Sequence, residues 1–495
     1  MKFTSIFQIV ACLTLGVLHA DASQEKPNIV YILADDLGYG DVTCLNPGGK
    51  IPTPHLDRLA SQGMIFSDAH SSSSVCTPSR YNLLTGRHAW RTRLQKGVLG
   101  GWGRPLISAT RLTVPRLLKE NGYTTVCIGK WHLGMSMPNR SELHKVINDG
   151  PTTRGFDEFF GISASLDMPP YGFITGDRFT PPLDTEKELF KGRRGAAASS
   201  FHAENVLPIL VQKATEQISE KAALRKPFFL YLALTSPHTP IAPSESWRGK
   251  SSLGAYGDFV METDGAVGEV LRALDEASIS DQTLVIFSSD NGFAPAAGPK
   301  RLEKLGHFPS ASFRGYKADI WDGGHRVPFI ARWPGVVEAG TTRNDLIYLG
   351  DLIATCADIL DVKLPENAGE DSLSMLPALR GETDEHHPRT LIHHSINGCF
   401  GIREGDWKLE LCPGSGGWGT PVDSVARRRG LPDFQLYDLS KDRGETRNLQ
   451  AEYPEIVTRL RKKLEDQISK GRSTPGKELS NDTKVLVVKP PAVPE

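Results

Sequence analysis

Short apolar runs alternate with helix-like segments from about residue 28 to residue 360. NIVYILADD (28–36), KPFFLYLALTSPHTP (226–240) and TLVIFSSDNG (283–292) each open with a run typical of a buried strand. Continuous apolar strands between helices predict a large, mostly parallel sheet that is covered by helices on both faces, an α/β fold. The segments with predicted helices, some followed by a strand, are 55–66, 80–87 (a helix beginning near Arg80), 114–134, 256–277 and 346–360.

The pattern changes after about residue 375. RGETDEHHPRT (380–390) is charged and typical of a linker, whereas CFGIREGDWKLEL (399–411) and FQLYDL (434–439) alternate like half-exposed strands. YPEIVTRLRKKLEDQISKGR (453–472) predicts an amphipathic helix. We therefore expect two domains and two terminal segments: a signal peptide (1–22), a large domain (27–378), a smaller α+β domain (388–475) and a flexible tail (476–495).

The N-terminus resembles a secretory signal. Lys2 precedes an apolar run from Phe3 to Leu18, and Ala20-Asp21-Ala22 fits an A-x-A cleavage site. A membrane anchor is the alternative, but the run is short for a span of about 20 residues. The sequence around Cys12 also resembles a lipoprotein box, although the apolar run continues beyond it. We expect an exported protein, periplasmic or secreted, with no membrane span in the mature chain.

Composition narrows the class of partner. The 495 residues are 39% hydrophobic and 23% charged, which suits a globular protein, and the net charge of −1 gives no reason to expect nucleic acid or an anionic membrane. Six cysteines remain beyond Cys12, without a C-x-x-C pair that would predict a zinc site. Cys399 and Cys412 flank a predicted hairpin, and export would allow them to pair.

Two predicted strands end in hard oxygen donors. Asp35 and Asp36 follow the first, and Asp290 and Asn291 follow the strand at 283–292. Asp and Asn also start turns, so either pair alone is weak evidence. Ligands bind beyond the carboxyl ends of parallel strands, and Ca²⁺ or Mg²⁺ prefers such oxygens. Together the pairs predict a site for a divalent cation.

Several cationic side chains lie in loops after strands or in glycine-rich stretches. Each alone fits a solvated surface, but around a buried metal they would suit a tetrahedral oxyanion, sulfate or phosphate. Lys130 and His132 lie between two glycines, which let the backbone approach a ligand closely. These cationic residues are Arg80, Lys130, His132, His238, Lys317 and His325.

The stretch SSSSVCTPSRYNLLTGRH (71–88) places Cys76 in a polar, proline-containing segment, which is unusual for a structural thiol. CTPSRYNLLTGR resembles the C-x-P-x-R…TGR signature of type I sulfatases, and GYTTVCIGKWHLG (122–134) resembles their second signature. The resemblance extends over nearly all of the mature chain. It implies the alkaline-phosphatase-like fold and a sulfuric ester hydrolase.

This resemblance also implies a modified residue. Type I sulfatases convert the signature cysteine, here Cys76, into Cα-formylglycine by a formylglycine-generating or an anaerobic sulfatase-maturing enzyme. The hydrated aldehyde is a geminal diol: one hydroxyl attacks sulfur, and deprotonation of the other expels sulfate. The implied metal, usually Ca²⁺ with Mg²⁺ as the alternative, would be bound by Asp35, Asp36, Asp290, Asn291 and residue 76.

The remaining roles are also carried over from the resemblance. Lys130 and Lys317 would hold the sulfate, and Arg80 would orient the diol. His132 would be the base that restores the aldehyde, and His238 the acid that protonates the leaving alcohol. Ser165, in GISASLD, resembles a serine that supports the diol in this family.

The substrate is less well defined by the sequence. We expect a sulfated extracellular carbohydrate, because LTGRHAWRTRLQKGVLGGW (84–102) resembles sulfatases acting on 6-O-sulfated galactose or N-acetylgalactosamine. Asp167 and His202 lie in expected substrate-binding insertions, where both also fit ordinary polar loop residues. Ser165 and His325 are further candidate contacts. A phosphatase or phosphonate hydrolase of the same superfamily is the alternative enzyme, and a glycan-binding protein without activity is the other alternative.

Overall fold

The computed structural model describes residues 26–139, 141–382 and 389–487. The expected signal peptide, Cys12 and part of the predicted linker lie outside these residues. None of the helices in the described segments is long and apolar enough to cross a bilayer.

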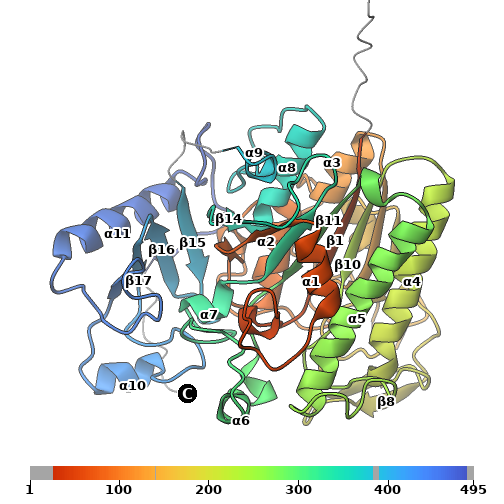
Figure 1. The fold of residues 1–495 in the computed structure, drawn as a ribbon, viewed down its shortest axis with the longest axis horizontal. Coiled ribbons are helices and arrows are strands. Elements are labelled where there is room, and N and C mark those ends of the chain that lie inside the picture. Colours follow the sequence, from red (N-terminus) through yellow and green to blue (C-terminus); the bar gives the residue numbers. More distant parts are fainter. Residues whose placement is uncertain (1–25, 140, 383–388, 488–495) are drawn as a thin grey trace, which may run out of the picture.

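A ten-stranded, mostly parallel sheet forms the centre of the large domain (Figure 1). Strands β11, β1, β10, β4 and β5 are parallel neighbours. Beyond them the sheet continues through antiparallel pairs, β12 on β11 at one side and β6 on β5 at the other, and β2 and β13 at one edge are again a parallel pair. In spatial order the strands are β13 (Thr341–Arg343), β2 (Met64–Phe66), β12 (Phe329–Arg332), β11 (Thr283–Ser289), β1 (Asn28–Ala34), β10 (Phe228–Ala233), β4 (Thr124–Lys130), β5 (Glu158–Ile162), β6 (Ile174–Thr175) and β7 (Arg178–Phe179).

Helices cover both faces of this sheet, as the continuous apolar strands predicted. Alternate residues of β1 face two different cores: Val30 and Ile32 pack with one set of helices, and Tyr31 and Leu33 with another. The first set is α1 (Pro54–Ser61), α4 (Ala203–Ala223) and α5 (Ala255–Glu276), of which α4 and α5 run side by side (Figure 1). The second set is α2 (Cys76–Thr85), α3 (Val114–Glu120), α8 (Leu352–Ile359) and α9 (Leu376–Leu379).

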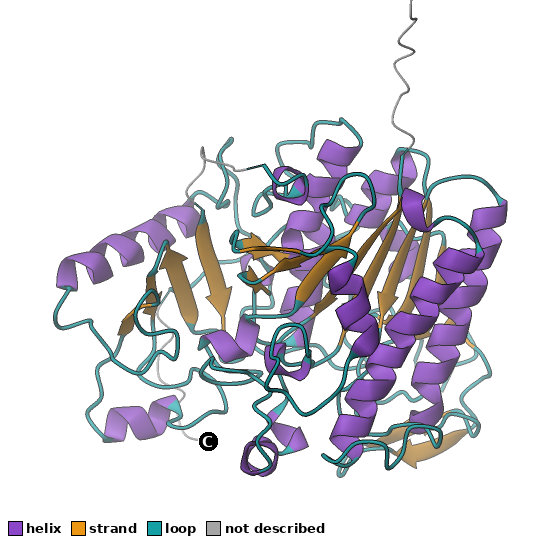
Figure 2. Ribbon diagram, viewed as in Figure 1, coloured by secondary structure: helices purple, strands orange, loops and turns teal. Residues whose placement is uncertain are grey.

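A smaller antiparallel sheet follows toward the C-terminus, with a long helix packed against it (Figure 2). Leu460, Leu464 and Ile468 place the apolar side of that helix in a core of their own with strand residues such as Ile402 and Leu409. The elements are β15 (Thr390–His394), β16 (Phe400–Glu404), β17 (Trp407–Glu410), β18 (Gln435–Asp438), α10 (Asp423–Arg428) and α11 (Pro454–Ser469). The predicted α/β fold with a small C-terminal α+β unit is confirmed.

Short elements complete the fold. β3 (Ala69–His70) pairs with β14 (Ile347–Tyr348), and β8 (Thr185–Glu188) pairs with β9 (Arg194–Ala197). Among the described residues, the α-helices not yet named are α6 (Pro299–Lys304) and α7 (Asp322–His325).

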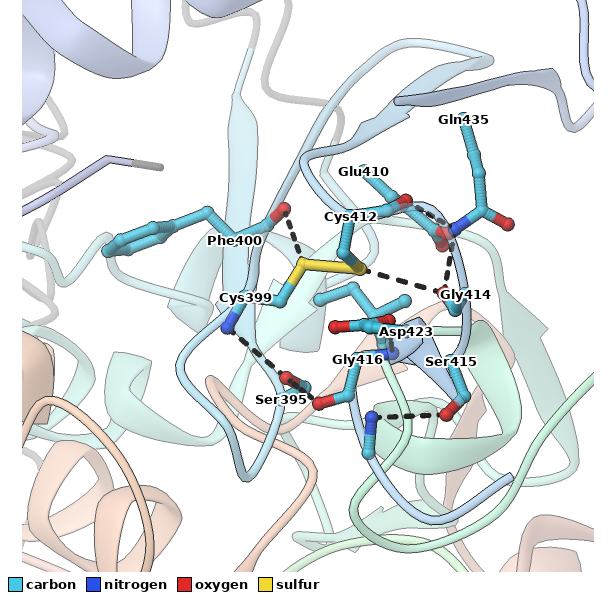
Figure 3. Close-up of a disulfide and its surroundings, with 12 residues drawn as sticks. Ser395, Cys399, Phe400, Glu410, Cys412, Gly414, Ser415, Gly416, Asp423 and Gln435 are labelled. Atoms are coloured by element: carbon cyan, nitrogen blue, oxygen red, sulfur yellow. Dashed lines mark hydrogen bonds between the residues drawn. A yellow bond between two sulfur atoms is a disulfide. The ribbon is translucent and has the colours of Figure 1, made fainter. Parts of the chain in front are cut away.

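The structure corrects two local predictions. The helix expected to begin near Arg80 begins at Cys76, and the helix expected from residue 346 begins at Leu352, after strand β14. In the segment expected to be a flexible tail, the Asp482 carboxylate pairs with the Arg87 guanidinium at 2.9 Å. Cys399 and Cys412, whose pairing the sequence left open, form a disulfide that joins the start of β16 to the segment after β17 (Figure 3).

Candidate active site

The acidic strand ends come together as expected. Ala34 and Ser289 are register partners at the ends of parallel strands β1 and β11, so the residues that follow them are neighbours. Asp36 adopts a left-handed backbone conformation (φ 65°), and its N–H donates to Asp290 Oδ1 at 3.2 Å. The Asn291 amide donates to Asp36 Oδ1 at 2.7 Å. Chain reversal after the two strands thus gathers Asp35, Asp36, Asp290 and Asn291, all buried.

Three cations from other parts of the chain balance these three carboxylates. Lys130, the last residue of β4, places its ammonium nitrogen 2.8 Å from both oxygens of Asp35. Lys317 Nζ lies 2.7 Å from both oxygens of Asp36. Arg80 donates through Nε to Asp290 Oδ2 at 2.9 Å.

The balance of charge decides the protonation of the acids. Burial raises the pKa of both Asp35 and Asp36, but Lys130 and Lys317 are the largest opposing influences, and each pKa ends below its ordinary value. The carboxylates are therefore ionised at neutral pH. They form a set of anionic ligands inside a site whose fixed charges nearly cancel.

Cys76 lies in the first turn of α2 and is 1% exposed. Its sulfur and ligand atoms of Asp35, Asp36 and His238 all lie within 4.8 Å of one another. Burial raises the pKa of the thiol to about 12, although Lys130 and Lys317 lower it. An unmodified Cys76 is thus a neutral thiol at physiological pH, which makes it a poor nucleophile.

The four oxygen-donor residues fit a hard divalent cation. Asn291 Oδ1 is buried and has no hydrogen-bond partner among the described residues, although its own amide nitrogen is bonded. Carboxylate and amide oxygens are the ligands that Ca²⁺ and Mg²⁺ prefer. Lys130 and Lys317 contact Asp35 and Asp36 in the same buried cluster.

Two histidines present different nitrogens to the site. His132 has φ 56°, and its Nε2 lies 2.6 Å from the Leu99 carbonyl oxygen, so Nε2 carries a proton and Nδ1 holds the lone pair. His238 has the opposite arrangement, with Nδ1 2.6 Å from the Thr239 carbonyl and Nε2 3.4 Å from Asp36 Oδ2. Burial and then Lys130 lower the pKa of His132 well below its ordinary value, so His132 is neutral at physiological pH.

Of the four predicted substrate contacts, Ser165 lies two residues after Ser163, whose carbonyl accepts the His132 N–H at 3.0 Å. Ser165 Oγ is buried with no hydrogen-bond partner in the described part of the chain. Asp167 forms an ion pair with Arg193 at 2.7 Å, and Arg193 was not singled out from the sequence. His202 is exposed at the N-terminus of α4.

His325 lies elsewhere, and its prediction as a substrate contact is corrected. Its ring is fully buried, with Nδ1 2.9 Å from His70 Nδ1 and Nε2 3.3 Å from Lys408 Nζ. The glycines before it allow the backbone of α7 to pack tightly, since a Cβ at Gly324 would lie 2.4 Å from the Asp319 carbonyl oxygen. They do not create an approach for a ligand.

Leu99 was also missed from the sequence. Its N–H donates to Thr77 Oγ1 at 3.2 Å, and its carbonyl accepts from His132, so one backbone unit connects the residue after Cys76 to the histidine. The only sequence signal is its position in the glycine-rich stretch GVLGGWG (97–103). Backbone contacts of this kind leave no side-chain pattern.

Comparison with known proteins identifies the family. The family model described as Sulfatase matches residues 27–362. The chain is 33% identical to an N-acetylgalactosamine-6-O-sulfatase of Bacteroides thetaiotaomicron, covering 90% of this chain and 93% of that protein. It is also 33% identical to human arylsulfatase A, covering 88% of this chain and 86% of the relative.

Solved structures agree with this assignment. A Bacteroides thetaiotaomicron sulfatase structure, described with the metabolism of multiple glycosaminoglycans, matches with a TM-score of 0.80 and 32% identity, covering 90% of this chain and 99% of that one. The phosphonate monoester hydrolase of Agrobacterium radiobacter matches with a TM-score of 0.58 at 19% identity, covering 89% of this chain and 95% of that one, and shares the fold alone. With the family model spanning most of the large domain, the chain belongs to the sulfatase family, the enzymes that hydrolyse sulfuric esters.

Proposed function

We propose that this sulfatase removes sulfate from an extracellular sulfated carbohydrate, specifically 6-O-sulfated galactose or N-acetylgalactosamine. The observation that carries the proposal is the cluster in which Lys130 and Lys317 lie against Asp35 and Asp36 beside Cys76. Two ammonium groups and a set of hard metal ligands around one buried cysteine suit a tetrahedral dianion or its ester.

Asp35, Asp36, Asp290 and Asn291 would hold the divalent metal, with Ca²⁺ proposed ahead of Mg²⁺. When bound, the metal supplies Lewis-acid stabilisation of negative charge on the sulfate oxygens. Type I sulfatases use formylglycine and a divalent metal, and Cys76 is the residue proposed for oxidation by a formylglycine-generating or anaerobic maturing enzyme. As a hydrated aldehyde, residue 76 supplies the hydroxyl that attacks sulfur.

The remaining side chains bind and move protons. Lys130 and Lys317 bind sulfate oxygens, and Arg80, itself fixed by Asp290 and by the Lys130 carbonyl, orients residue 76. His132 accepts a proton at Nδ1, because the Leu99 carbonyl keeps the proton on Nε2. His238, when protonated, donates from Nε2 to the leaving alcohol, since the Thr239 carbonyl occupies Nδ1.

The proposed substrate rests on the relatives and on the insertions near the site. One relative is the N-acetylgalactosamine-6-O-sulfatase of Bacteroides thetaiotaomicron. Another is the N-acetylgalactosamine-6-sulfatase of Canis lupus familiaris, which is 30% identical over 92% of this chain and 88% of its own length. Ser165, Asp167 and the exposed His202 are proposed to contact the sugar. Such a substrate lies outside the cell, in agreement with the predicted signal peptide and with a periplasmic or secreted enzyme.

A panel of defined sulfated sugars tests this proposal. Matured protein is expected to release sulfate from galactose 6-sulfate or N-acetylgalactosamine 6-sulfate more efficiently than from the 4-sulfated isomers. The Cys76→Ala variant is the control and should release none. Turnover of aryl phosphates without turnover of any sulfate ester would instead favour the phosphatase alternative.

Mass spectrometry tests the modified residue separately. The tryptic peptide that ends at Arg80 should carry an aldehyde at position 76 in active protein. Fully active protein with an unmodified thiol at this position would contradict the proposed chemistry.

A further inference from the structure

The turn that carries Lys317 is strained and is held in place from outside. Residues 316–319 form a closed turn in which the Asp319 N–H donates to the Tyr316 carbonyl at 3.0 Å. Ala318 has φ 80°, a left-handed conformation that is unfavourable for a residue other than glycine. Such a conformation persists when the surrounding contacts determine it, so the turn depends on its neighbours.

The Asp319 carboxylate is the centre of those contacts. Its Oδ2 accepts the Tyr316 N–H at 3.1 Å, which closes the turn on the residue before Lys317. Its Oδ1 accepts two backbone N–H groups of the C-terminal unit, from Trp418 at 3.0 Å and Gly419 at 2.7 Å. One buried side chain therefore ties the Lys317 turn to a loop about a hundred residues later.

The loop that Asp319 contacts (residues 415–419) and the Lys317 turn have further anchors. Ser415 accepts the Ile320 N–H at 2.7 Å, and Ala318 accepts the Ile396 N–H at 3.1 Å. Ser395 donates from its hydroxyl to the Gly416 carbonyl, next to the Cys399–Cys412 disulfide (Figure 3). A Cβ at Gly417 would lie 2.2 Å from the Ala318 carbonyl oxygen, so the loop backbone lies directly on the turn.

We propose that Asp319 is a positioning residue, which holds the ammonium group of Lys317 in the sulfate site by fastening its turn to residues 418–419 of the C-terminal unit. Asp319 does not touch the carboxylate cluster in the contacts described above; it acts through Lys317. The inference rests on the proposed sulfatase function, and it assigns the C-terminal unit a part in building the sulfate site.

A double-mutant cycle tests the inference. Asp319→Ala should lower kcat/KM by about 10²-fold, the scale expected for a misplaced binding group. In a Lys317→Ala background the same change should have little further effect, because interacting residues are not additive. The inhibition constant for free inorganic sulfate should rise in Asp319→Ala, and Asp319→Asn, which keeps Oδ1 as an acceptor, should recover most of the activity.

Asp264 provides a matched control. It is also a buried carboxylate whose pKa is raised to about 6 by burial, like that of Asp319, and it accepts the backbone N–H groups of His55 and Leu56. Its partners lie at the start of α1 rather than beside Lys317. Asp264→Ala should lower thermal stability as Asp319→Ala does, with kcat/KM and sulfate inhibition unchanged.

Hydrogen exchange gives a measure that needs no turnover. The amides of residues 318 and 417–419 should exchange faster in Asp319→Ala than in wild type, and as in wild type in Asp264→Ala. Equal losses of activity from Asp319→Ala in the wild-type and Lys317→Ala backgrounds would overturn the inference. Failure of wild-type matured protein to hydrolyse any sulfate ester would refute the proposed function instead. The exchange result would still show whether Asp319 fastens the Lys317 turn to residues 418–419.

Discussion

Each carboxylate at the site has its own cation, and this pairing determines what a single substitution does. Lys130 contacts both oxygens of Asp35, and neither side chain reaches solvent. Removing one partner of a buried ion pair leaves the other charge without compensation, whereas removing both is tolerated better. Stability and catalysis at this site can therefore be separated by mutation.

Lys130→Met is expected to lower the free energy of unfolding by about 3–5 kcal/mol in protein treated with a chelator, because Asp35 loses its main partner. It should also reduce kcat/KM by about 10²–10³-fold, the usual effect of removing one fixed charge from a transition state. Denaturant titration and steady-state kinetics measure the two effects.

The double variant Lys130→Met, Asp35→Asn distinguishes the two roles. It should recover much of the lost stability and none of the lost activity. Lys213→Met is the control, because Lys213 forms an exposed pair with Glu216 and such pairs contribute little. Recovery of activity in the double variant would show that Lys130 only neutralises Asp35.

His88 makes the stability of the protein depend on pH. Its ring is buried against Trp90, with ring centroids 5.2 Å apart, and neither ring nitrogen has a hydrogen-bond partner among the described residues. Burial lowers the pKa of His88 from 6.5 to about 4. The unfolded chain therefore takes up a proton at a higher pH than the folded chain does.

The contribution of the neutral, buried His88 ring to the free energy of unfolding is complete above pH 6.5. It is lost as the pH falls from 6.5 toward 4. At 1.36 kcal/mol per pKa unit, this one ring accounts for about 3 kcal/mol over that range. His88→Phe keeps an aromatic ring on Trp90 but cannot titrate, so its free energy of unfolding should fall less between pH 7 and pH 4. Equal slopes for both proteins in urea titrations would contradict this prediction.

At the scale of elements, helix α2 depends on the glycine that ends it. Gly86 has φ 62°, and a Cβ there would lie 2.4 Å from the Ile353 side chain of α8 and 2.9 Å from the Gly369 backbone. Alanine would incur both the left-handed penalty of about 1–2 kcal/mol and a steric overlap of about 1–3 kcal/mol.

Gly86→Ala should therefore destabilise the protein by about 2–5 kcal/mol, the sum of those two effects. Gly249→Ala is the matched control, because Gly249 has φ 76° with nothing within 4 Å of the added Cβ. It should show only the first effect. Thermal unfolding of both variants measures the difference, and equal midpoints would show that the α2–α8 contact adapts freely.

The Cys399–Cys412 disulfide also contributes to stability at the scale of elements, because it connects the start of β16 to the segment after β17. It closes a loop with a sequence separation of 13 residues, for which restriction of the unfolded chain predicts about 3 kcal/mol of stability. Replacing both cysteines with alanine should lower the free energy of unfolding by about that amount, whereas Cys127→Ala serves as a control for loss of a buried thiol outside the loop. A double variant as stable as wild type would contradict this expectation.

Across the whole molecule, the sequence predicted the strands and site residues whose positions depend on the local pattern of apolar and polar residues. The apolar runs predicted strands β1 and β11, and their parallel pairing brings Asp35, Asp36, Asp290 and Asn291 together as expected. The start of α2 was placed too late, because Cys-Thr-Pro-Ser reads as a turn. Pro78 in fact lies in the first turn of the helix, where a missing N–H leaves no intrahelical bond unmade.

Contacts between distant segments could not be predicted in this way. Asp319 reaches residues 418–419, and Leu99 reaches His132 through backbone atoms that any residue possesses. His325 was misassigned for the same reason, since only the folded chain shows that His70 and Lys408 surround its ring.

The complete burial of α2 has a consequence for the biosynthesis of this enzyme. Every residue from Cys76 to Thr85 is buried, and the preceding segment is covered by parts of the chain made much later: Ser73 Oγ donates to the His394 carbonyl, and Ser74 accepts the Ala318 N–H. A maturing enzyme could not reach Cys76 once these segments had closed over it. The proposed oxidation would thus compete in time with folding, and protein that folds first should remain a permanently inactive thiol form that later exposure to the maturing enzyme does not rescue.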